Sequence, residues 1–174
     1  MSSYVRPKSL GATVFFTVAV AQRGSDVLVQ EIVALRHAIR ATRVNRPFQI
    51  DAWVVLPDHL HCIWTLPEGD ADYSTRWKEI KSGFTKTLGR VGPRSASKVG
   101  KGEAGIWQRR FWDHHIRDAD DFATHLRYCW WNPVKHGFVK RPVDWPLSSI
   151  HRDIRLGQVE PEWAGIGVDG GFGE

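Results

Sequence analysis

Two histidines, His59 and His61, lie one residue apart within a hydrophobic stretch of the chain. In an extended strand alternate side chains point to the same face, so both imidazoles share one face while Leu60 and Cys62 point to the other. Two imidazoles at this spacing can bind one divalent cation and leave positions open for a substrate. The alternative is that each histidine is hydrogen-bonded separately at a sheet surface, although polar groups in an otherwise apolar element are costly.

Further polar residues recur at helical spacing after Asp118. Asp121, His125, Tyr128 and Asn132 fall at i, i+4, i+7 and i+11, so they share one face of a predicted helix. Tyr128 is either a reactive group on this face or an amphipathic tyrosine at the edge of the core. The proline that follows Asn132 predicts that the helix ends or kinks there, or that Asn132 caps a second helix.

Aromatic and basic residues alternate in a third stretch, which contains Trp107, Arg109, Arg110 and Trp112. Unpaired bases stack on aromatic rings and cationic side chains follow the phosphates, so this pattern is typical of a single-stranded nucleic acid site. The chain has nine tryptophans, and most of them are expected in the core.

Positive charge is concentrated in the middle of the chain. The net charge is +5 and the pI about 9.5. Residues 76–117 contain eleven Lys or Arg and only three acids, a local charge of +8, so the remainder carries about −3. A phosphate backbone is the natural complement, and a solvated surface is the alternative.

The elements that must position these residues follow from the apolar periodicity. Residues 12–21 predict a central strand, apolar on both faces. A helix opened by Ser25 and Asp26 follows, with an apolar stripe of Leu28, Ile32, Leu35 and Ile39. Further strands are predicted at residues 50–56, 59–66 and 106–116, and further helices at residues 73–90 and from 118 onward. Residues 89–105 predict a flexible basic loop.

This order predicts an α+β fold, a ferredoxin-like antiparallel sheet with helices on one face plus an added helix that carries Tyr128. We expect a single domain over residues 1–164 and a disordered tail over residues 165–174. The apolar runs are too short to span a membrane and the first ten residues contain no signal-peptide core, which predicts a cytoplasmic protein with no membrane partner. Cys62 and Cys129 are expected to be buried thiols.

Three segments together resemble the REP-associated tyrosine transposases, a branch of the single-tyrosine HUH transposase family, in which two histidines flank a bulky hydrophobe. They are LPDHLH at residues 56–61, WQRRFWDHHIRD at 107–118 and YCWWNPVKHGFVKRPVDWPLSS at 128–149. The resemblance covers nearly the whole chain. Trp130 and Trp131 depart from the smaller or tyrosine residues expected there, which removes a tyrosine that would compete with Tyr128.

The resemblance implies a metal-dependent enzyme that cuts and rejoins single-stranded DNA in transposition. Tyr128 would attack the phosphate and form a 5′-phosphotyrosine, with a divalent metal, Mg²⁺ or Mn²⁺, held by His59, His61 and Asn132. His125 could assist proton transfer. His114 and His115 are interpreted as structural residues of the sheet or as contacts to a DNA phosphate, and not as ligands of the metal.

The implied partner is hairpin DNA of the repetitive extragenic palindrome (REP) type. Its backbone would be held by basic side chains, namely Lys78, Lys81, Lys86, Arg109 and Arg110, while Trp107 and Trp112 would offer rings on which unpaired bases stack. We expect a monomer, since little chain separates the last strand from the tyrosine helix, and a dimer with the active site shared between two chains is the alternative. Two alternatives stay open: a domesticated protein that binds hairpin DNA without cutting it, and a metal-dependent phosphoesterase of another fold, which usually carries two HxT-type motifs.

Overall fold

The sheet of the computed structural model has four strands in the order β2-β3-β1-β4, each antiparallel to its neighbours. The strands are β1 (Thr13–Ala19), β2 (Gln49–Val55), β3 (His59–Thr65) and β4 (Trp112–His115). The structure describes residues 9–89, 91–165 and 172. The strand order and the succession of strands and helices confirm the predicted ferredoxin-like α+β fold.

The two central strands, β1 and β3, pair along their whole length, from Thr13 opposite Thr65 to Ala19 opposite His59. Strands that are covered on both faces carry consecutive apolar residues. Residues 14–18 of β1 are accordingly all buried, as predicted for a central strand. The histidine-bearing strand β3 is therefore fixed from both sides, by β1 and by β2.

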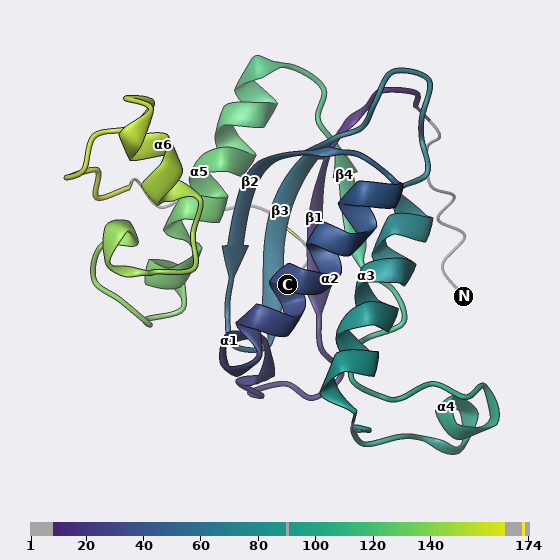
Figure 1. Ribbon diagram of the computed structural model, residues 1–174. Helices are drawn as coiled ribbons and strands as arrows, with labels where there is room; N and C mark the ends of the chain where they lie inside the picture. The colour runs from purple at the N-terminus through teal and green to yellow at the C-terminus, as the bar shows by residue number, and fades with distance from the viewer. Residues whose placement is uncertain (1–8, 90, 166–171, 173–174) are drawn as a thin grey trace.

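One face of the sheet is covered by α1 (Val27–Gln30), α2 (Ile32–Asn45) and α3 (Tyr73–Leu88), which lie in front of the strands in Figure 1. The prediction of one continuous first helix is wrong, because the chain leaves α-helical geometry at Glu31, where φ is −104° and ψ is 30°. Leu28, Leu35 and Ile39 are nevertheless buried in one core, since both pieces pack on the same face.

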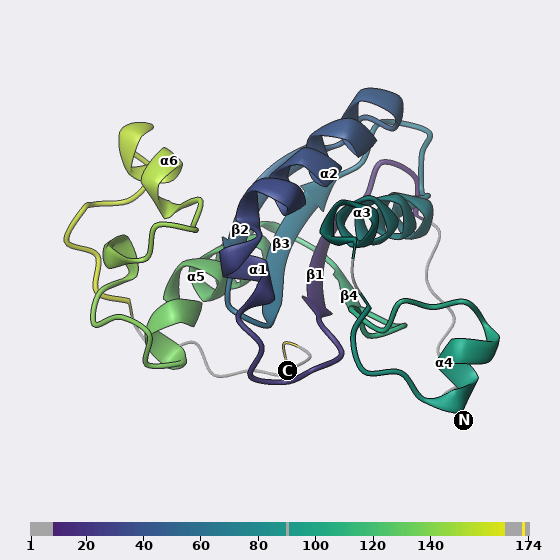
Figure 2. The same cartoon turned by 60° about the horizontal axis from the view of Figure 1, so that its bottom comes forward.

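The opposite face of the sheet is covered by α5 (Ala119–Lys135), the added helix of the prediction. Figure 2 shows α5 on the far side of the strands from α2 and α3. Tyr128 and Cys129 pack there against Phe15 of β1, Val54 of β2 and Ile63 of β3. The two histidines point to this face as well, so the fold sets α5 over them.

The predicted strand at residues 106–116 is shorter than expected. Thr17 pairs with Trp112 and Val20 forms an isolated bridge with Trp107, so four residues, 108–111, face only two residues of β1. The extra residues must leave the ladder as a bulge, and β4 is confined to Trp112–His115. The predicted basic loop also contains a short helix, α4 (Ala96–Gly100), whose N-cap Ser95 accepts a hydrogen bond from the backbone of Lys98.

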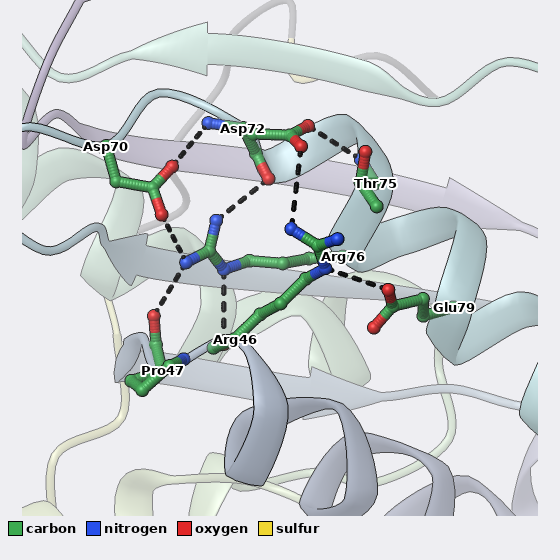
Figure 3. A network of polar contacts seen from close by, with 7 residues as sticks. All are labelled: Arg46, Pro47, Asp70, Asp72, Thr75, Arg76 and Glu79. Atoms are coloured by element: carbon green, nitrogen blue, oxygen red, sulfur yellow. Dashed lines mark hydrogen bonds and ion pairs between the residues drawn. The ribbon is translucent and has the colours of Figure 1, made fainter.

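A buried arginine, Arg76, joins three segments at one end of the molecule (Figure 3). Its side chain is 1% exposed and donates hydrogen bonds to the backbone carbonyls of Arg46, Pro47 and Asp72. It also forms an ion pair with Asp70, with the nitrogen and oxygen 2.6 Å apart. The hydrogen bond from Arg76 holds the pKa of Asp70 below its ordinary value. This network fixes the start of α3 to the end of α2.

After α5 the chain forms η1 (Pro142–Asp144) and α6 (Ile150–Arg155), and returns along the outer edge of β2. Val55 donates its backbone N–H to the carbonyl of Leu147, and Ser149 donates to the carbonyl of Trp53. The outer edge of β2 is therefore hydrogen-bonded by a segment of the same chain.

The predicted disordered tail, residues 165–174, lies largely outside the described residues, which include only Gly165 and Phe172 of it. Within the described ranges no helix has the length and apolar character needed to cross a membrane.

Candidate active site

His59 and His61 lie side by side on the face of β3 that α5 covers, with their ring centroids 5.1 Å apart. Their side chains are 6% and 0% exposed. Leu60 and Cys62 point to the opposite core, as the strand alternation predicts. The two imidazoles thus share one buried position beneath the helix.

Each of these imidazoles has a partner on its Nδ1 atom. Asp58 Oδ1 lies 2.7 Å from His59 Nδ1, and Thr17 Oγ1 lies 2.9 Å from His61 Nδ1. Burial by itself would raise the pKa of Asp58, but hydrogen bonds from His59 and from the Gly24 backbone N–H hold it below its ordinary value. Asp58 is therefore a carboxylate that accepts a hydrogen bond from the Nδ1–H of His59.

The tautomer of His61 follows from the hydrogen bonds of Thr17. The Thr17 hydroxyl donates its one hydrogen to the backbone carbonyl of Phe172, at 2.6 Å. It can therefore only accept from His61, so Nδ1 of His61 carries a proton. In both histidines the nitrogen with lone-pair character is then Nε2, the atom a metal would use.

Helix α5 begins at Ala119, and the carboxylate of its N-cap, Asp118, accepts a hydrogen bond from the backbone N–H of Asp121. It continues through Pro133 to Lys135, so Asn132 neither ends the helix nor caps a second one. Pro133 lacks an N–H, yet the helix persists because its buried face remains packed on the sheet.

The face of α5 that meets the sheet brings Tyr128 against the histidine pair. The rings of Tyr128 and His61 meet edge to face with centroids 5.1 Å apart. Two turns later, His136 meets His59 with centroids 5.0 Å apart. Asn132 is fully buried and lies between these two contacts along the helix. It therefore faces the histidine pair, and all these residues come from one chain.

Tyr128 is fully buried in this structure. The ring of Phe172 stacks on it with centroids 3.7 Å apart and planes 18° from parallel. Phe15 meets its edge at 6.0 Å, and Lys135 Nζ donates a hydrogen bond to its hydroxyl at 3.1 Å. The phenol oxygen is thus beside a cation, while the ring lies among apolar groups.

A second polar group consists of His114 from β4 together with Asp121 and His125 of α5, which lie two turns and one turn before Tyr128. Their ligand atoms lie within 4.8 Å of one another, so they could hold a metal ion. The interpretation of His114 as a residue of the sheet or a phosphate contact stays a prediction, and this group adds a metal ion as a further candidate. The His114 and His125 rings stack with planes 14° apart, so one must rotate before a single ion lies in both ring planes.

Asp121 holds this second group together. His114 Nε2 and Arg117 Nε lie 2.8 and 3.0 Å from its Oδ2. Burial by itself would raise the pKa of Asp121, but these hydrogen bonds hold it far below its ordinary value. Burial lowers the pKa of His125, whose Nδ1 lies 2.8 Å from the Asp121 carbonyl. At neutral pH the group therefore pairs an ionised carboxylate with a neutral His125.

A groove of about 680 Å³ runs between α3 and the bulged segment before β4. It is lined by Lys78, Lys81, Lys86, Trp107, Arg109 and Arg110, six of the seven side chains predicted to contact DNA. Lys81 donates a hydrogen bond to the Gln108 carbonyl at 3.0 Å. Trp107 is only 8% exposed and packs on Phe84, so most of its ring belongs to the core.

A smaller pocket of about 250 Å³ lies next to His59. Arg23, Arg110 and Trp112 line it together with Thr17. Trp112, the seventh of the predicted DNA contacts, therefore lies at the histidine site and not in the groove. Arg110 lines both pockets, so the groove and the histidine site adjoin at this residue.

Three residues of the site were missed by the sequence patterns. Lys135 continues the polar stripe one step beyond Asn132, but the proline between them predicts that the helix ends or kinks, or that a second helix begins there. Thr17 looks like an ordinary strand threonine, and its role follows only from the register that sets it opposite His61. Phe172 falls in the glycine-rich tail, and no local pattern indicates its contact with Tyr128.

No protein-family model matches the chain. It is 48% identical to the REP-associated tyrosine transposase of Escherichia coli (strain K12), over its whole length and 98% of that protein. A Haemophilus influenzae protein named for the same group is 41% identical, over 95% of this chain and 94% of its own. A solved structure of a REP-associated tyrosine transposase bound to a REP hairpin superposes with a TM-score of 0.87 at 47% identity, covering 100% of this chain and 98% of that one. The chain belongs to the REP-associated tyrosine transposase family.

Proposed function

We propose that this protein cuts single-stranded DNA beside a hairpin, holds the cut end on Tyr128 as a 5′-phosphotyrosine, and rejoins it to a 3′ end. The observation that carries the proposal is the contact between Tyr128 and His61, with ring centroids 5.1 Å apart. It joins a candidate nucleophile to a candidate metal ligand from two distant parts of the chain. The solved relative binds a REP hairpin, which supports hairpin DNA as the substrate.

The donors around His59 suit a catalytic divalent metal. We propose His59 Nε2, His61 Nε2 and the Asn132 side-chain oxygen as its ligands, with Mg²⁺ or Mn²⁺ as the ion. The Nδ1 contacts to Asp58 and Thr17 support this, because metal-binding histidines commonly direct their second nitrogen to such a partner. The ion would supply charge neutralisation at the scissile phosphate. The group around Asp121 is a second place where an ion could bind.

The chain's own residues account for the rest of the reaction. Tyr128 oxygen attacks the phosphorus in line, the bond from phosphorus to the 3′ oxygen breaks, and a free 3′-OH forms. One phosphodiester replaces another, so rejoining needs no external energy source. We propose His125 as a candidate for proton transfer, since its imidazole is neutral at neutral pH and lies one turn before Tyr128.

The groove beside α3 supports a path for the DNA backbone. Lys78, Lys81 and Lys86 line one wall, and Arg109 and Arg110 come from the bulged segment. Arg110 also lines the pocket next to His59, where Trp112 offers a ring for stacking. We propose that the hairpin lies along the groove and that its single-stranded flank enters the pocket.

The test is capture of the covalent intermediate. A labelled oligonucleotide that carries the hairpin of the solved relative and single-stranded flanks is incubated with the protein and Mn²⁺ or Mg²⁺. We expect an adduct that survives denaturation with the wild type and with Tyr73→Phe, a matched buried tyrosine whose hydroxyl donates to Asp113. We expect none with Tyr128→Phe. Hairpin binding without any adduct would favour a protein that only binds DNA.

The two histidines are tested together. His59→Ala with His61→Ala should abolish the adduct while the affinity for the hairpin stays close to that of the wild type. An equal loss of hairpin binding and of cleavage would show instead that the histidine pair has a structural role.

A further inference from the structure

Lys135 lies two turns after Tyr128 on α5, and its ammonium reaches the phenol. Nζ donates a hydrogen bond to the Tyr128 hydroxyl at 3.1 Å and lies 5.0 Å from the centre of the ring. The contact exists because α5 continues through Pro133 as a helix, which keeps residue 135 on the same face as residues 128 and 132.

The surroundings of Tyr128 make this cation important. The ring is fully buried and packs with Phe15, Val54, Ile63 and Phe172. An anion in such apolar surroundings is strongly disfavoured unless an opposite charge or hydrogen-bond donors compensate for the missing water. A charge-assisted hydrogen bond from an ammonium supplies both in one contact.

We propose that Lys135 is a further catalytic residue, whose ammonium stabilises the negative charge on the Tyr128 oxygen in both directions of the strand-transfer reaction. This inference rests on the proposed function. In cleavage the phenol proton passes to His125, the proposed proton-transfer group, the Tyr128 oxygen forms its bond to phosphorus, and the departing 3′ oxygen takes a proton from water. In rejoining the 3′ oxygen attacks and loses its proton, and the Tyr128 oxygen leaves as a phenolate paired with Lys135.

A second polar side chain beside the Tyr128 ring, His61, directs its Nδ1–H away from the phenol. His61 comes from β3 and donates a hydrogen bond from its Nδ1–H to the Thr17 hydroxyl. β1 and the C-terminal segment contribute phenylalanine rings, Phe15 and Phe172. Lys135 is the cation whose hydrogen bond to the phenol oxygen the structure displays.

Lys135→Met and Lys135→Arg test the charge, and Lys140→Met is the matched control, an exposed lysine just beyond the helix. With the hairpin oligonucleotide and Mn²⁺, we expect Lys135→Met to slow adduct formation and rejoining alike, by about 10²-fold. Lys135→Arg should recover most of that rate, and Lys140→Met should match the wild type. Hairpin affinity should be equal in all four proteins, because Lys135 acts on the tyrosine.

A second measurement separates charge stabilisation from a structural role. Tyr128 is replaced by 3,5-difluorotyrosine, whose phenol ionises more readily and so needs less help from a cation. In that background Lys135→Met should slow adduct formation and rejoining by a factor about 10-fold smaller than it does in the protein with Tyr128. A structural role would leave the effect unchanged in this background, and that result overturns the proposal.

Different results would overturn the proposed function and the role of Lys135. If the wild type binds the hairpin but forms no adduct, the proposed function is overturned and the role of Lys135 with it. If the wild type and Lys135→Met form and rejoin the adduct at equal rates, only the role of Lys135 is overturned.

Discussion

The ring of Phe172 lies flat on the ring of Tyr128, with centroids 3.7 Å apart. The same residue accepts, through its carbonyl, the hydroxyl hydrogen of Thr17. A residue near the end of the chain therefore covers the proposed nucleophile and contacts the threonine behind the proposed metal ligand His61.

Removing the ring of Phe172 should uncover Tyr128. We expect Phe172→Ala to raise the initial rate of adduct formation several-fold, because a tyrosine that is 0% exposed cannot meet a phosphate until its cover moves. The measurement is adduct yield against time at saturating hairpin DNA. Leu156→Ala, at an exposed apolar position on a different segment, is the control. An unchanged rate would mean that the Phe172 ring is not what limits access.

Removing the hydroxyl of Thr17 should weaken metal binding without moving the histidines. Thr17→Val keeps the shape of the side chain but leaves Nδ1 of His61 without this partner. Changes to such supporting contacts typically cost about 10–100-fold in metal affinity. The measurement is the Mn²⁺ concentration that gives half-maximal adduct formation.

The matched control for Thr17 is Thr13→Val. It removes a hydroxyl from the same strand, where Thr13 pairs with Thr65 away from the site. Equal Mn²⁺ requirements in both variants would argue against the role assigned to Thr17.

The groove lysines should determine the salt dependence of hairpin binding. Removing one ion pair between a lysine and a DNA phosphate should reduce the slope of log affinity against log salt by about 0.7–0.9. We expect Lys78→Met and Lys86→Met each to show this reduction, since both side chains line the groove. Binding measured across a salt series checks it, with Lys140→Met as the unchanged comparison. Equal slopes of log affinity against log salt for all the proteins would mean that the DNA does not contact Lys78 and Lys86 in the groove.

The Arg76 network should give a contribution to stability that depends on pH. Asp70→Asn removes the charged partner of the buried guanidinium, which keeps its three backbone carbonyls, so we expect a loss of about 1.5–3 kcal/mol at pH 7. The folded protein lowers the pKa of Asp70. The stabilisation is therefore fully present above the unfolded value of about 3.9 and is lost as the pH falls through the lower folded value.

Urea unfolding of the wild type and Asp70→Asn from pH 7 downward measures this contribution. The difference in unfolding free energy should stay constant to about pH 4 and shrink below it. Asp26→Asn, at an exposed carboxylate, should show no comparable loss at pH 7. A constant difference at every pH would mean that the charge of Asp70 is not responsible.

The sequence predicts correctly which side chains share a face of a single strand or helix, because one periodicity decides this. Alternation placed His59 and His61 on one face, and helical spacing placed Tyr128 and Asn132 on another, and both arrangements are present in the structure. Neither pattern could show that the two faces meet, because that depends on packing between distant segments. The resemblance to the transposases supplied that step.

The errors have local physical causes. Aromatic and basic alternation cannot distinguish a paired strand from a bulge, so residues 108–111 were assigned to β4. Pro133 is a strong signal for the end of a helix, yet tertiary packing held α5 helical to Lys135 and brought its ammonium to Tyr128. The position of Phe172 follows from long-range contacts that leave no pattern in the sequence.

The return of the chain along β2 has a consequence for the molecule in a crowded cell. An open strand edge is a template on which another chain can add a strand, and this is a common route to aggregation. Here Leu147 and Ser149 already occupy the hydrogen-bonding groups of Val55 and Trp53. At the opposite side the sheet ends in a strand of only four residues, next to a bulge. The segment that follows the tyrosine helix therefore also shields the sheet from strand exchange with other copies.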